Sequence, residues 1–146
     1  MNQEVLTRGD AQPASLRLHE TELPNISVEY MYRDASNYKS FEVVSFANPQ
    51  RISAAKIWQQ INEALEGVML FPGQPIFRPE WVGLPTVFLF EQSGYSRSDD
   101  DHDWHEVVSV EETASPSTFG ENSNINNFID TLRQAHLASV WGSKRK

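Results

Sequence analysis

The segment ISVEYMYR, residues 26–33, decides the fold because its side chains alternate strictly between two kinds. One face of the extended chain carries the apolar and aromatic members, which are Ile26, Val28, Tyr30 and Tyr32. The β-rich segment 41–47 follows residues 34–40, whose Asp, Ser and Asn side chains favour a turn. The two segments predict an antiparallel hairpin. Asn48 and Pro49 end it, because proline cannot donate a ladder hydrogen bond.

Two later segments have helical spacing. The first follows Ser53, a suitable N-cap residue, with Gly67 as the expected stop. Its apolar stripe consists of Ile57, Ile61, Ala64, Leu65 and Val68. The second spans residues 125–141, with Asn124 as its cap. Because His136 lies on the apolar side of that helix, we expect a hydrogen-bonded core histidine there and not a catalytic one.

The remaining segments complete the predicted sheet. The continuous apolar run 86–90 suits a central strand, and residues 104–110 alternate again, so we expect a second hairpin with an acidic tip. Residues 70–85 are rich in proline and glycine and predict an irregular loop. The sequence therefore predicts an α+β fold. It has an antiparallel sheet of about four strands in the order ββαββα, with two helices packed on one face.

We expect residues 25–146 to form one domain after a loose N-terminal arm, residues 1–24. The arm is either a poorly ordered terminus or a segment that pairs with a sheet edge or a partner. A chain of 146 residues is long enough to bury a core without disulfides, and it contains no cysteine. The lack of cysteine excludes thiol catalysis and cysteine-ligated metals, and it suits a reducing cytoplasm.

Composition also restricts the partners that the chain is expected to bind. The formal net charge of −8 repels phosphate backbones, so we expect no direct nucleic-acid binding and favour basic partners or dissolved cations. No apolar run approaches the roughly 20 residues that span a bilayer, so we expect no membrane association. No GxSxG, GxGxxG or GxxxxGK motif is present, so the sequence predicts no cofactor of those classes.

The run DDDHDWHE, residues 99–106, is the strongest site candidate because it is hard to explain as packing. Carboxylate and imidazole groups are ligands for Mg²⁺, Mn²⁺ or Zn²⁺, so Asp101, His102 and His105 form a candidate metal site. If a strand already begins at His102, the two histidines project to opposite faces and cannot share an ion. A turn over residues 100–103 would let them converge, with Asp34 or Glu106 completing the set.

Two parts of the chain resemble a family of small, largely uncharacterised bacterial proteins with YxYRDAxNYK and DHxWHE segments. The matching positions are Tyr30, Tyr32, Arg33, Asp34, Ala35, Asn37, Tyr38 and Lys39, then Asp101, His102, Trp104, His105 and Glu106. The resemblance covers residues 26–113. It implies a bacterial or phage origin and one coherent domain, and it carries no established activity to this chain.

We expect the turn at residues 33–39 and the acidic run to meet at one end of the sheet. Arg33 or Lys39 would then neutralise some aspartates in a structural network, or the unpaired acids would face a basic partner. The candidate partner-binding residues are Arg33, Asp34, Asn37, Tyr38, Trp81, Asp101, His102, Trp104, His105 and Glu106.

Three functions remain open at this stage. The preferred one is a non-enzymatic cytoplasmic interaction protein, such as an accessory, inhibitor or immunity-type factor that binds a protein partner. The alternative is a metal-dependent hydrolase acting on a phosphoester. An acidic nucleic-acid mimic ranks third, because the acids concentrate in one loop.

Overall fold

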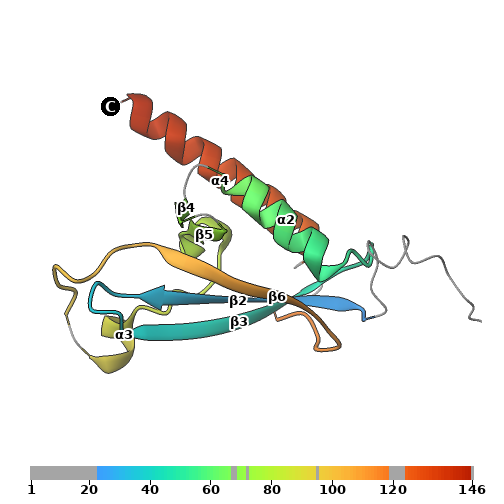
Figure 1. Cartoon of the computed structure of the whole chain (residues 1–146), viewed down its shortest axis with the longest axis horizontal. Helices are drawn as coiled ribbons and strands as arrows, with labels where there is room; N and C mark the ends of the chain where they lie inside the picture. Colours follow the sequence, from blue (N-terminus) through green and yellow to red (C-terminus); the bar gives the residue numbers. More distant parts are fainter. Residues whose placement is uncertain (1–22, 67–68, 72, 95, 119–123, 146) are drawn as a thin grey trace, which may run out of the picture.

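The alternating segment forms β2 (Asn25–Arg33), an interior strand of a five-stranded antiparallel sheet in the computed structural model (Figure 1). The structure describes residues 23–66, 69–71, 73–94, 96–118 and 124–145, so nearly all of the predicted arm, residues 1–24, lies outside it. The strand order is β3-β2-β6-β5-β4. The other strands are β3 (Lys39–Ala47), β4 (Met69–Phe71), β5 (Gln74–Phe77) and β6 (His105–Thr113).

The predicted hairpin is confirmed, because β2 pairs with β3 from Asn25↔Ala47 to Arg33↔Lys39. The four side chains assigned to the apolar face of β2 are completely buried. They lie beneath α2 (Ala54–Ala64) and α4 (Ile125–Arg145), which cover one face of the sheet in Figure 1. The predicted α+β class with two helices on one face is therefore correct.

Both predicted helix caps are present. The Ser53 hydroxyl accepts the Lys56 N–H at 3.2 Å, and the Asn124 side chain accepts the Asn127 N–H at 2.9 Å. The helix stop expected at Gly67 lies outside the described residues, and α2 ends at Ala64. His136 is buried and its Nε2 lies 3.0 Å from the Glu66 carbonyl oxygen, which confirms the core histidine. No helix in the described ranges is long and apolar enough to cross a bilayer.

The strand predicted at residues 86–90 is wrong, and so is the second hairpin built on it. Val87 and Phe88 are buried in extended chain, and residues 89–93 form the short helix α3 (Leu89–Ser93). The place beside β6 is taken by β5, with the pairs Ile76↔Glu106 and Phe77↔His105. The segment 70–85 is therefore more regular than predicted, since it contains β5 and the 3₁₀ turn η1 (Pro79–Val82).

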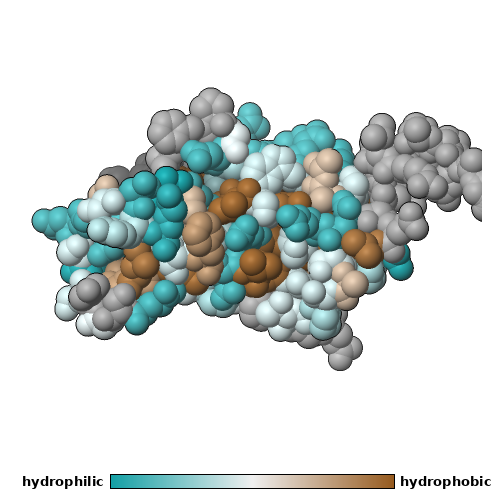
Figure 2. Space-filling view, turned by 60° about the horizontal axis from the view of Figure 1, so that its bottom comes forward, coloured by the Kyte–Doolittle hydropathy of each residue, from teal (hydrophilic) through white to brown (hydrophobic). Residues whose placement is uncertain are grey.

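A register shift interrupts the alternation predicted for residues 104–110, and it sets which side chains of β6 face the core. Tyr30 pairs with Val107 whereas Glu29 pairs with Ser109, so Val108 is the extra residue of a bulge. The core side consequently carries His105 and Val107, while Val108 is exposed on the face that lacks helices. Figure 2 looks onto this face and shows apolar patches among polar side chains.

Candidate functional site

The turn after β2 and the acidic loop before β6 meet at one end of the sheet, as the sequence predicts. The Ala35 N–H donates to the Asp100 carbonyl at 3.0 Å, and the Ser36 hydroxyl donates to the Asp100 carboxylate at 2.5 Å. Two segments more than sixty residues apart thereby form one polar surface.

The turn is held by its own polar groups. The Asp34 carboxylate accepts the Tyr38 N–H at 2.9 Å, and Asn37 adopts a positive φ of 71°, which asparagine tolerates better than most residues. Arg33 donates to the Asn37 side-chain oxygen at 2.8 Å. Tyr38 is left with 69% of its surface exposed, so the turn presents an aromatic ring to solvent.

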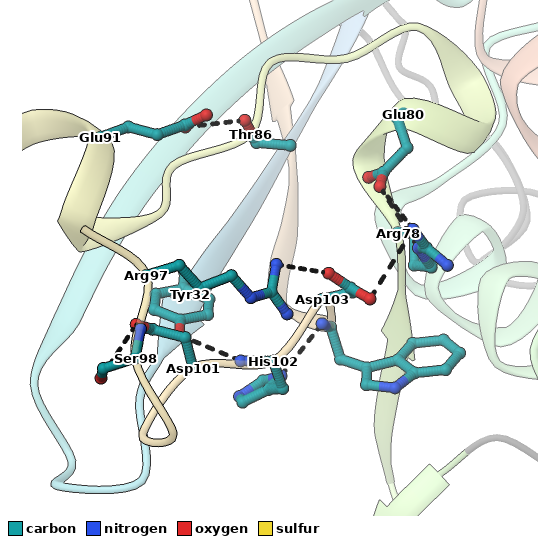
Figure 3. Close-up of polar contacts among 11 residues, drawn as sticks. Tyr32, Arg78, Glu80, Thr86, Glu91, Arg97, Ser98, Asp101, His102 and Asp103 are labelled. Carbon is teal, nitrogen blue, oxygen red and sulfur yellow. Dashed lines mark hydrogen bonds and ion pairs between the residues drawn. The ribbon is translucent and has the colours of Figure 1, made fainter.

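Asp101 is fixed from the core side of the loop (Figure 3). The hydroxyl of the buried Tyr32 donates to Asp101 Oδ1 at 2.5 Å, and the Ser98 N–H donates to Oδ2 at 2.9 Å. These hydrogen bonds, the one from Tyr32 first, hold the pKa of Asp101 below its usual value. The carboxylate therefore stays ionised at neutral pH although every partner in these contacts is uncharged.

His102 braces the loop against the end of β2. Its Nδ1 accepts the Trp104 N–H at 3.0 Å, which leaves Nε2 to carry the proton and donate to the Arg33 carbonyl at 2.7 Å. Both ring nitrogens are thus used within the protein, and the neutral tautomer is defined by its two backbone partners. The side chain lies partly buried beside the Tyr32 ring, with ring centroids 5.2 Å apart.

His105 is not a surface residue, which corrects its place among the expected partner-binding groups. It is completely buried among Tyr30, Tyr32 and Phe88. Its Nε2 accepts the Val87 N–H at 3.1 Å, whereas its Nδ1 has no hydrogen-bond partner among the described residues. Burial lowers its pKa to about 4, with the Asp103 backbone acting in the opposite direction.

Two of the acids are neutralised by arginines. Glu106 receives two hydrogen bonds from Arg33, at 3.0 and 3.2 Å, in a two-pronged ion pair between neighbouring strands. Asp103 pairs with Arg97 at 2.8 Å, and its other oxygen lies 3.8 Å from Arg78. The hydrogen bond from Arg97 holds the pKa of Asp103 below its usual value. An ion-pair network therefore exists, but with partners other than those expected: Arg33 pairs with a glutamate, and Asp103 pairs with Arg97.

The two tryptophans of the expected contact set pack on each other and not on the turn. Their rings meet edge to face with centroids 5.6 Å apart, and both side chains are half-buried. Trp81 belongs to η1, and Trp104 immediately precedes β6. They form a second aromatic surface, and neither lines the pocket described next.

An open pocket of about 750 Å³ lies where the turn, α3 and the acidic loop come together. Its lining residues are Asp34, Tyr38, Leu89, Phe90, Ser96, Ser98, Asp100 and Asp101. Sequence reasoning missed Leu89 and Phe90 because it placed them in a strand, and it did not include Asp100 among the partner-binding residues. The sequence holds one indication that Leu89 and Phe90 lie beside polar groups, because the apolar run 86–90 is followed directly by a polar stretch.

The pocket combines negative charge with an apolar wall. Its three carboxylates, those of Asp34, Asp100 and Asp101, form no ion pair with any residue that the structure describes. Their protein partners are the hydroxyl and amide donors described above. The nearby Arg97 is directed to Asp103, and its guanidinium carbon lies 5.9 Å from the Phe90 ring centroid.

The three side chains proposed as metal ligands are not arranged around a common point. Asp101 is bound to Tyr32 and Ser98, His102 to two backbone groups, and His105 faces the core. Across the described ranges, no group of three or more histidine, aspartate or glutamate side chains could hold a metal ion.

Comparisons of the chain with protein-family models, with curated proteins and with solved structures gave no match.

Proposed function

We propose that the protein is a non-enzymatic interaction protein of the cytoplasm that binds a protein partner by receiving one of its basic side chains in the acidic pocket. The observation that carries this proposal is the way in which the acids are held. The carboxylates of Asp34, Asp100 and Asp101 are positioned by neutral donors, so their charges remain available. Those of Asp103 and Glu106 are already neutralised by arginines.

The shape and lining of the pocket suit a lysine or arginine side chain. Such a side chain has an apolar stem and a charged head, and here Leu89 and Phe90 lie beside the carboxylates. The exposed Tyr38 ring supplies an aromatic group that covers the stem or stacks on a guanidinium. The net charge of −8 would steer a basic partner toward the protein. An accessory, inhibitory or immunity-type role is consistent with such binding.

Quantitative affinity capture from the producing cells tests the proposal. The wild-type protein is compared with Asp100→Asn and Tyr38→Ala, which alter the pocket, and with Asp99→Asn. Asp99 is exposed, adjacent in sequence and outside the pocket lining, so its variant makes the same change in net charge.

One partner should be recovered equally by the wild type and Asp99→Asn, and about fivefold less by each pocket variant, since a contact worth about 1 kcal/mol changes affinity by that factor. Asp100→Asn retains an oxygen that can accept from Ser36, so the turn should remain intact. If no protein shows this pattern of recovery, the proposal is refuted.

A further inference from the structure

We propose that the outer edge of β3, at Phe41–Val43, binds an extended segment of the same partner as an additional strand. This inference rests on the proposed function and names the form in which the partner binds. Strand addition to an exposed sheet edge supplies main-chain hydrogen bonds for affinity, and side-chain pockets beside the edge supply specificity.

Within the part of the chain that the structure describes, no strand pairs with the outer edge of β3 at Phe41–Val43. The Ser45 N–H and carbonyl both point away from β2, since they bond Thr118 at 2.8 and 2.9 Å. Because strand geometry repeats every two residues, the corresponding groups of Phe41 and Val43 point the same way. Among the described residues, only the Glu42 side chain meets them, accepting the Val43 N–H at 3.0 Å.

The chain's own segment shows what this edge accepts. Thr118 bonds the Ser45 backbone and a parallel bridge joins Ala47 to Asn124, so other parts of the chain already bond the outer edge of β3 at its far end. Phe41 and Val43 precede these positions along β3. A partner strand would replace the Glu42 carboxylate at the Val43 amide, which releases a negative charge beside the incoming strand.

The side chains of the open stretch are apolar and exposed. Phe41 and Val43 have 52% and 51% of their surface accessible, and their register with β2 places them on the face that α2 and α4 do not cover. Phe41 also lies opposite the buried Met31 on β2. Exposed apolar side chains on an unpaired edge strand promote pairing with another chain, and native proteins usually prevent this with charged residues or proline.

The edge leads directly from the acidic pocket. Tyr38 lines the pocket, and Phe41 follows after about 10 Å of extended chain. Helix α3 borders the pocket and also contacts the start of β3, where Gln92 donates to the Ser40 hydroxyl at 2.7 Å. A strand paired with Phe41 and Val43 can therefore place a basic side chain in the pocket. A second copy of this chain fits less well, because two copies each carry a net charge of −8.

The test uses a labelled synthetic peptide of alternating valine and threonine with one terminal arginine, and measures binding by fluorescence anisotropy. A second peptide carries N-methyl groups on alternate amides, which keeps every side chain but prevents pairing with an edge. A third peptide replaces the arginine with alanine. On the protein side, Val43→Pro removes only an outward-facing N–H, which edge strands tolerate. Sedimentation of the protein alone establishes whether it is monomeric.

The parent peptide should bind, and the methylated peptide should bind about tenfold more weakly, as expected for the loss of two backbone hydrogen bonds. Val43→Pro should weaken binding about fivefold, as expected for the loss of one backbone hydrogen bond of about 1 kcal/mol. If the methylated peptide binds as well as the parent, the strand inference is overturned while the pocket proposal stands. Failure of the parent peptide to bind, or a dimer that Val43→Pro dissociates, also overturns it. If the alanine peptide binds as well as the parent while methylation and Val43→Pro still weaken binding, strand addition at the edge is supported and the pocket proposal is refuted.

Discussion

The buried His105 makes a specific prediction for the dependence of stability on pH. Its pKa is lowered to about 4 in the folded protein because the ring has no contact with water, whereas the unfolded chain has the ordinary value of 6.5. Below 6.5 the unfolded state therefore binds a proton that the folded state does not. The stabilising contribution is fully present above pH 6.5 and is lost progressively as pH falls toward about 4.

The magnitude follows from this difference in pKa. Between pH 6.5 and about pH 5 the free energy of unfolding should fall by about 1.4 kcal/mol per pH unit, which amounts to about 2 kcal/mol. The variant His105→Gln removes the titration while keeping an oxygen that can accept the Val87 N–H. Urea unfolding followed by tryptophan fluorescence, at pH 7.5 and pH 5, gives the change for each protein.

The wild type should lose about 2 kcal/mol more than His105→Gln over this interval. The comparison does not depend on the cost of the substitution itself, because that cost cancels between the two pH values. The other histidines are common to both proteins, so their contributions also cancel. Equal losses in the two proteins would refute the argument that His105 is held neutral by burial.

Three further predictions concern a hydrogen bond and an ion pair at the site and the cap of α4. Tyr32→Phe should destabilise the fold by about 1–3 kcal/mol in urea unfolding, because the hydrogen bond from the hydroxyl to Asp101 is lost. The same loss should raise the pKa of Asp101 in a carbon-detected NMR titration, and an unshifted pKa would contradict this. Arg33→Lys should cost about 0.5–1 kcal/mol, with less effect in high salt, because lysine cannot make the two-pronged contact to Glu106. Asn124→Ala should cost about 1 kcal/mol through loss of the α4 cap, and an unchanged denaturation midpoint would argue against that cap.

The elements with clear periodicity were predictable from the sequence, and the ambiguous ones were not. Alternation over 26–33 located β2, and the cap residues Ser53 and Asn124 located both helices. The run 86–90 misled because a short apolar run suits a buried strand, a helix or buried extended chain equally well. Pro75 concealed β5, which tolerates it because the pairing with β6 involves only Ile76 and Phe77.

The meeting of the two polar segments was predictable from the sequence, but the hydrogen-bond partner of each side chain was not. Both polar segments were identified, and their meeting at one end of the sheet was expected. What decides the role of each side chain is a partner far away in the chain, such as the Tyr32 hydroxyl for Asp101 or the Val87 N–H for His105. The burial of His105 had one local signal, since it lies two residues before the buried Val107 and so shares its face.

The core and the site share a strand, and this limits which substitutions can separate binding from stability. Tyr32 places its ring in the core and its hydroxyl on Asp101, so a change there alters the fold and the pocket together. Tyr38 and Asp100 line the same pocket from exposed positions, so their substitution removes charge or aromatic surface without opening a core cavity. A binding defect in Tyr38→Ala or Asp100→Asn at unchanged stability would therefore identify the pocket as the contact surface, whereas the same defect in Tyr32→Phe would not.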